Sequence, residues 1–194
     1  NTFNVSYQMG FNTNATFRNF QLTDGTAKDY LGFGADVRNL PSSFPAHLGE
    51  HSTDEAAAFT RQINQRWGIN KFTAIPDQKI SLTSHRSYDV GGWKIGNITN
   101  LNWSTEFDYS ETVNNNYIAY DVKNDVSRPR FEYNDIRYKN TSKLGALFNW
   151  SFQRDGSKYE LRNFFSQRGV SALTQREGMN YYSDKDIRKW ESLY

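Results

Sequence analysis

Apolar and polar residues alternate with a period of two through "LGALFNWSFQRDGSKYELRNFF", residues 144–165. A period of two places alternate side chains on opposite faces of a β-strand. Arg154, Asp155, Gly156 and Ser157 interrupt the pattern with turn-forming residue types, which predicts a hairpin. One face of the first strand would carry Leu144, Ala146, Phe148, Trp150 and Phe152. The fold must therefore bring something apolar against a large aromatic surface, either a protein core or another apolar medium.

The composition favours strands with one apolar face and one hydrated face. Mean hydropathy is −0.82, yet aromatic residues make up 16% of the chain. The net charge of +2 and the even scatter of Lys and Arg argue against a nucleic-acid partner. Cysteine is absent, which excludes a disulfide scaffold and a Cys-ligated zinc site. No apolar run approaches the length of a membrane-spanning helix.

Similar alternation recurs along the chain. It predicts strands at residues 3–11, 78–88 and 93–109, the first with Phe3, Val5, Tyr7, Met9 and Phe11 on one face. "NATFRNFQL" is expected to continue the first strand or to pair with it. "DVGG", residues 89–92, reads as a tight turn. A strand of seventeen residues would be roughly 55 Å long, whereas strands of soluble domains usually have about 5–6 residues.

Three long connections are expected between these strands. Residues 22–52 are irregular and lead into one short helix over residues 53–67, capped by Ser52 or Thr53 and ended by Gly68. Residues 110–135 form the second long connection, and residues from about 167 to 185 form the third. Long connections that alternate with tight turns are typical of a transmembrane β-barrel. The fold class predicted is all-β: part of a large antiparallel transmembrane barrel with long outside loops and one short loop helix.

Aromatic residues beside both tight turns agree with this prediction. Tyr88 and Trp93 flank "DVGG", and Trp150, Phe152 and Tyr159 flank "RDGS", where an interfacial girdle is expected. Alternation by itself does not distinguish lipid from a protein core. The alternative is therefore a soluble β-sandwich that binds carbohydrate and buries the same face under a second sheet.

The stretch "DYLGFGADVRNLP", residues 29–41, resembles a segment found just after the plug domain of TonB-dependent outer-membrane receptors. The matching residues are Asp29, Tyr30, Leu31, Gly32, Phe33, Arg38, Leu40 and Pro41. "SYQMGFNTNATFRNF", "AIPDQKISLT" and "KLGALFNWSF…YELRNFF" are similar in order and spacing to strands of the same barrels. The resemblance covers most of the chain.

The resemblance implies a barrel of about 22 strands in the bacterial cell outer membrane, with an N-terminal plug and a periplasmic contact to TonB. Residues 1–194 would be the N-terminal portion of that barrel, with the plug and the remaining strands outside it. The implied function is uptake of a scarce small-molecule or oligomeric ligand, such as a siderophore, glycan or peptide. Partners would be outer-membrane lipid, the plug domain, TonB and a surface lipoprotein, with no cofactor and no enzymatic activity.

Aromatic residues in the expected outside loops are the candidates for ligand binding: Tyr30, Phe33, Trp67, Tyr117 and Tyr120. Their rings could stack on a sugar or siderophore ring, or they could pack the loops against one another. On the hydrated face, Lys143, Asn149, Glu160 and Arg162 would contact the plug or line the route of the ligand.

No catalytic or metal site is predicted. His47 and His51 lie four residues apart, but Gly49 argues against the helix that would bring them together. Glu106 and Asp108 share the hydrated side of a strand, which explains them without a catalytic role. The chain has no nucleophile elbow, phosphate-binding loop or dinucleotide fingerprint.

Overall fold

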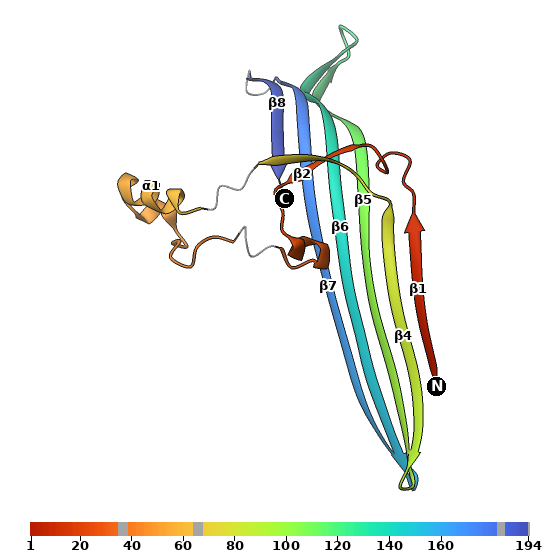
Figure 1. Cartoon of the computed structure of the whole chain (residues 1–194). Coiled ribbons are helices and arrows are strands. Elements are labelled where there is room, and N and C mark those ends of the chain that lie inside the picture. Colours follow the sequence, from red (N-terminus) through yellow and green to blue (C-terminus); the bar gives the residue numbers. More distant parts are fainter. Residues whose placement is uncertain (35–38, 64–67, 182–184, 194) are drawn as a thin grey trace.

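Six antiparallel strands form the main sheet of the computed structural model, which describes residues 1–34, 39–63, 68–181 and 185–193. Their order across the sheet is β1-β4-β5-β6-β7-β8, so all but one of the neighbouring pairs are consecutive hairpin partners (Figure 1). The strands are β1 Thr2–Gly10, β4 Asp77–Val90, β5 Trp93–Asp121, β6 Val126–Arg154, β7 Ser157–Asn180 and β8 Lys185–Leu193. The prediction of an antiparallel, mostly β structure is confirmed.

Both predicted tight turns are confirmed. Gly91 and Gly92 join β4 to β5 with φ of +59° and +79°, and Asp155 and Gly156 join β6 to β7 with φ of +49° and +79°. Two successive residues with positive φ form the type I′ turn, whose twist matches that of the flanking strands. The local residue types therefore favour both turns. The two turns lie at the same end of the sheet (Figure 1).

The predicted long connection over residues 110–135 is wrong. β5 and β6 continue as one hairpin to a short turn at residues 122–125, and each strand has 29 residues, roughly 95 Å at the usual rise. Asn114, Asn115 and Asn116 suggested a loop, but they pair with Tyr133, Glu132 and Phe131 across the hairpin. An exposed ribbon accepts polar residues on both faces, so polarity did not mark the end of the strand.

The predicted third connection, from about residue 167 to residue 185, is also wrong. β7 continues to Asn180, which pairs with Phe131 of β6, and β8 begins at Lys185. This stretch contains Gly169 and Gly178, a residue type that is depleted in strands. Both instead occupy paired positions of the ladder, opposite Ser142 and Tyr133.

A second, two-stranded sheet lies across one face of the main sheet near the start of β4 (Figure 1). It pairs β2, Asn19–Thr23, with β3, Ile69–Thr73. The expectation that residues 14–22 continue or pair with the first strand is wrong. The backbone N–H of Thr16 donates to the carbonyl of Asn12, and Phe17 adopts a φ of +62°. This turn directs the chain away from β1.

The core lies between the two sheets. Phe20 of β2 is fully buried, and its ring packs edge-on against Phe107 at 5.4 Å and Tyr138 at 5.2 Å. The whole cluster comprises Ala15, Phe20, Leu22, Ala74, Phe107, Tyr138 and Leu173. It covers only the part of the sheet face that lies beyond the level of Trp103.

The short helix is α1, Thr53–Arg61, and 3-10 turns occur at η1, Ala27–Leu31, and η3, Leu48–Glu50. Of the two expected caps, Ser52 rather than Thr53 caps α1, and it does so in a capping box with Glu55. The helix ends at Arg61 rather than near Gly68, and Trp67 lies outside the described residues. In the described chain, no helix has the length and apolarity needed to cross a membrane.

The main sheet is open. β1 and β8 are its two outer strands, and the described residues do not close it into a barrel. β8 pairs only with Leu173–Asn180 of β7, so in the described chain the rest of β7 has no partner on that side.

Candidate functional site

One face of the main sheet carries most of its large apolar side chains, whereas Ile98, Leu147 and Phe164 lie on the other. Residues directly opposite in the register share a face, and the register aligns Tyr7, Ile80, Trp103 and Leu144 in one row across four strands. This apolar face also includes Phe3, Val5, Leu82, Tyr88, Val90, Trp93, Ile95, Leu101, Ala146, Phe148, Trp150, Phe152, Tyr159, Leu161 and Phe165. The predicted alternation of 144–152 is thus repeated, in register, on four neighbouring strands.

The part of this face between the two tight turns and Trp103 is open to the surroundings, and we refer to it as the apolar band. Phe148 is 47% exposed, Leu101 45% and Leu161 54%. The second sheet reaches none of these residues. The band is therefore an extended aromatic and aliphatic surface that the described chain leaves uncovered.

Polar residues within the band are satisfied by the sheet itself. The Asn97 side-chain amide donates to the carbonyl of Asn149 at 3.1 Å, and that of Asn163 donates to the carbonyl of Phe148 at 3.0 Å. Arg86 of β4 carries a charge within the band, and its guanidinium donates to the hydroxyl of Tyr88, 3.5 Å away and nearer the turn. The apolar band thus exposes few polar groups that need water.

Aromatic rings mark both ends of the band. At the turns, Trp93 of β5 and Tyr159 of β7 lie 6.4 Å apart, and Trp150 stacks on Phe152. At the other end stand Trp103 and, above it, Phe107 and Tyr138. The rings beside the turns were predicted. The position of Trp103 at the other end of the band follows only from the strand register.

A strap, residues Asp29–Gly34, crosses the upper boundary of the band. The indole N–H of Trp103 donates to the carbonyl of Tyr30, and the side-chain amide of Gln167 donates to that of Gly32, both at 2.6 Å. Phe33 stacks on Phe165 with ring centroids 6.3 Å apart. Gly32 has a φ of +82° and lies against Gly169, where a side-chain carbon would meet backbone at 2.8 Å. The glycine of "LGF" is therefore needed for this close approach.

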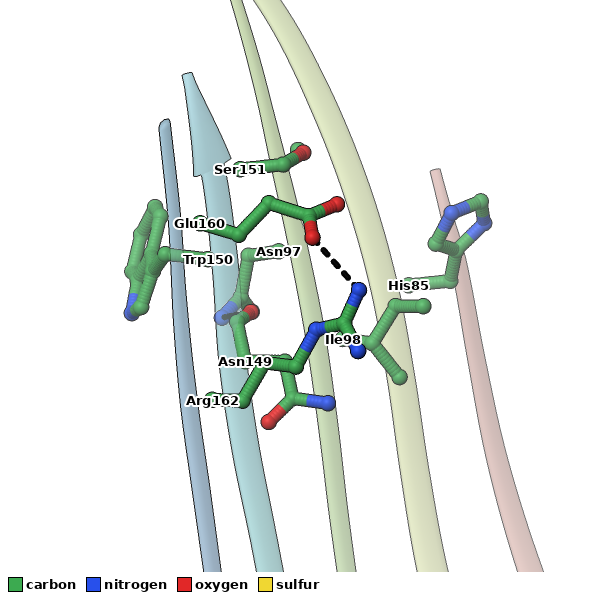
Figure 2. A pocket seen from close by; sticks show the side chains of 9 residues that line it. His85, Asn97, Ile98, Asn149, Trp150, Ser151, Glu160 and Arg162 are labelled. Atoms are coloured by element: carbon green, nitrogen blue, oxygen red, sulfur yellow. Dashed lines mark hydrogen bonds and ion pairs between the residues drawn. The ribbon is translucent and has the colours of Figure 1, made fainter. Parts of the chain in front are cut away.

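The opposite face of the sheet is polar. Here the Asn100 amide donates to Thr83 Oγ1 at 2.8 Å, and the Asn102 amide donates to Asn100 Oδ1 at 3.0 Å. Nearer the turns, Glu160 accepts from Lys158 at 2.6 Å and from Arg162 at 2.5 Å. Figure 2 shows the hollow beside this ion pair, which Arg162 and Asn149 from neighbouring strands line together with His85 of β4. The four predicted polar-face residues therefore share one surface, although Lys143 lies higher than the hollow.

Several groups above the level of Trp103 have shifted pKa values, Asp135, Asp77 and Tyr109 among them. The bidentate hydrogen bond from Arg176, at 2.6 and 2.7 Å, lowers the pKa of Asp135. Burial raises the pKa of Asp77, although the backbone N–H of Phe107 donates to its carboxylate. A hydrogen bond to the Glu111 carboxylate raises the pKa of Tyr109 to about 12. In the described residues, no three His, Cys, Asp or Glu side chains converge as a metal site would require.

The structure separates the predicted ligand-binding aromatics into two groups. Tyr30 and Phe33 belong to the strap on the apolar face, and both are partly exposed. Tyr117 and Tyr120 lie near the tip of the β5–β6 hairpin, where the Tyr120 hydroxyl donates to Asp125. Trp103 precedes Tyr117 by fourteen positions on β5, roughly 46 Å, so the two groups do not form one site. Trp67 lies outside the described residues.

Sequence reasoning missed the contact between the strap and the sheet. It treated the strap as a free loop and named Tyr30 and Phe33 for their rings, whereas Trp103 and Gln167 bind the strap through its backbone carbonyls. The only local signal was the Gly32 position in "LGF". These contacts join residues that are 73 and 135 positions apart, so the local pattern of apolar and polar residues cannot predict them.

Comparison with known proteins found no matching family model, no matching curated protein and no matching solved structure.

Proposed function

We propose that this chain forms part of the wall of an outer-membrane β-barrel, in a receptor that takes up a scarce ligand with energy delivered through TonB. The apolar band would contact lipid, and the polar face would line the interior. The long strand extensions and the strap would lie outside the cell. The chain would contribute binding and passage, without covalent chemistry.

The observation that carries this proposal is the match between the apolar band and a lipid bilayer. From Trp93 to Trp103, β5 contributes eleven residues to the band, and membrane-crossing strands need about 9–11 residues. The corresponding rise is roughly 33 Å, which a tilt of about 45° reduces to about 23 Å, close to the apolar height of such barrels. Aromatic rings occur at both ends, where girdles are expected.

The exposure of the band also weighs against the alternative, a soluble carbohydrate-binding sandwich. Such a fold packs the inner faces of two sheets against each other along their length. Here Phe20 and its cluster cover the sheet only above Trp103, while Phe148 stays 47% exposed. A large uncovered aromatic surface in water favours association and aggregation.

The open edges favour a wall that continues on both sides. In lipid, an unpaired strand edge leaves backbone groups without hydrogen-bond partners, so a membrane-embedded sheet must close. β1 and the lower part of β7 would each need a further strand. The resemblance of residues 29–41 to TonB-dependent receptors supplies the proposed identity of that larger barrel, with its plug, TonB contact and surface lipoprotein.

The proposal is tested by spin labels at two adjacent positions. Because this chain contains no cysteine, Phe148→Cys and Leu147→Cys each introduce one unique attachment site here. Labels are introduced into the complete protein, with cysteines outside this chain replaced, and reconstituted in phospholipid vesicles. Collision with oxygen, which concentrates in lipid, and with a water-soluble nickel complex is then measured by electron paramagnetic resonance.

We expect the label at position 148 to collide mainly with oxygen. The label at position 147, on the polar face, should collide mainly with the nickel complex. A label at position 148 that meets water as readily as the label at position 147 would contradict the proposal. So would shielding of position 148 from both reagents, which would indicate a protein core.

A further inference from the structure

The polar face holds two cations directly opposite each other. Lys143 of β6 pairs in register with Arg168 of β7, and both side chains are exposed. Like charges at directly opposed positions destabilise a sheet. The chain keeps this pair on a face that offers many neutral alternatives, such as the asparagines and serines of β5.

Two more cations stand above this pair on the same face. Lys139 lies four residues before Lys143 on β6 and Arg137 lies two residues before Lys139, so period-two geometry brings all three to one side. In the described chain, neither Arg137, Lys139 nor Arg168 forms an ion pair with a carboxylate. Among the described residues, the one ion pair of this group joins Lys143 to Glu106 at 3.1 Å.

The nearby acidic groups do not neutralise the cluster. Asp108 lies opposite Lys139 in the register, while the Asp77 carboxylate accepts from the backbone N–H of Phe107. With Asp77, which lies near Glu106 and Asp108, four cations therefore face three carboxylates and keep an excess of positive charge. The lower cations of this face differ, because Lys158 and Arg162 both bind Glu160 at 2.5–2.6 Å.

From this arrangement we infer that Lys143 and Arg168, supported by Lys139 and Arg137, bind a small polyanionic ligand with two or more carboxylate or phosphate groups. The guanidinium of Arg168 can grip such a group with two parallel hydrogen bonds, and Lys143 adds a point charge beside it. A ligand would also remove the repulsion between the two opposed cations. This inference rests on the proposed function, because the site would bind the transported ligand as it passes through the barrel. It limits the class of transported ligand to anions.

The test uses the complete protein in a non-ionic detergent and the fluorescent trianion hydroxypyrene trisulfonate as the probe. Fluorescence anisotropy gives the dissociation constant of the probe. We expect K143Q/R168Q to weaken probe binding about tenfold or more, a loss of about 1.4 kcal/mol. Competition by citrate and by pyrophosphate separates a preference for carboxylates from one for phosphates.

The matched control is K158Q/R162Q, which removes the same charge from the same face at cations already bound to Glu160. It should change probe affinity by less than about twofold. The charge-preserving pair K143R/R168K should keep most of the affinity. Circular dichroism verifies folding, and Arg168→Gln alone, at an exposed position, serves if the double variant does not fold.

An equal loss in both double variants would overturn the site, because net charge alone would then explain binding. Absence of probe binding by the unmodified protein, or full affinity in K143Q/R168Q and R168Q, would overturn it too. These outcomes are independent of the spin-label test. A lipid-exposed position 148 with no anion binding would leave the barrel proposal standing and remove only the anion site.

Discussion

The lower and upper parts of one sheet face differ in whether the second sheet covers them. Below Trp103 the described chain leaves the face open except where Phe33 stacks on Phe165, and above it Phe107 and Tyr138 are buried under Phe20. The same strands, with the same parity, carry both parts. The difference shows that one amphipathic pattern can serve two apolar environments, a protein core at one height and, as we propose, lipid at another.

The largest expected effect tests the covered part. Phe20→Ala removes a fully buried ring that touches Phe72, Phe107 and Tyr138, so the free energy of opening the second sheet should fall by about 3–5 kcal/mol. Hydrogen exchange of the Ala74 amide, which donates to the carbonyl of Arg18, measures this opening. Phe17→Ala, at a ring that is 68% exposed, should change it by less than about 0.5 kcal/mol. Equal effects of the two variants would mean that Phe20 does not anchor the layer.

The next largest effect tests the open part. Phe148 pairs with Thr99 near the middle of the band, so Phe148→Arg should destabilise the protein in vesicles by about 2–4 kcal/mol, the cost of a cation at the bilayer midplane. Leu147→Arg makes the same change on the polar face and should cost about 1 kcal/mol or less. Denaturant unfolding in phospholipid vesicles measures both. A greater loss for Leu147→Arg would reverse the assignment of the two faces.

The smallest expected effect tests the strap at the boundary between the open and the covered part of the face. Trp103→Phe keeps an aromatic ring but removes the hydrogen bond to the carbonyl of Tyr30, and should loosen the strap by about 0.5–1.5 kcal/mol. Exchange of the Gly32 amide, which donates to the carbonyl of Asp29, measures the strap locally. Trp93→Phe, at the other end of β5, should leave that exchange unchanged. Unchanged exchange in Trp103→Phe as well would show that Gln167 and the Phe33–Phe165 stack hold the strap without the indole.

Part of this fold was predictable from local sequence because its determinants lie close together in the chain. Alternation gave the strands around Phe148 and Phe3, and "DVGG" and "RDGS" gave two turns that need positive φ. Ser52 and Glu55 marked the start of α1. Strand ends were less predictable, because Asn114–Asn116 have low strand propensity but pair with β6 in an exposed ribbon.

The candidate sites were predictable to a smaller degree. Parity alone put Lys143, Asn149, Glu160 and Arg162 on one polar surface. It could not show that Arg168 lies opposite Lys143, since that depends on the register between β6 and β7. The aromatics Tyr30 and Tyr117 were grouped by residue type, and the structure places them on separate elements.

The sequence by itself determined which side of each strand is apolar, because side chains alternate with every residue regardless of what the strand packs against. Only the tertiary structure decided how much of that side stays open. The turn after Asn12 folds β2 and β3 over the sheet, and the contacts of Trp103 and Gln167 with the strap fix where the covered part begins. Those contacts join residues that are distant in the chain, so their position depends on the register of the whole sheet.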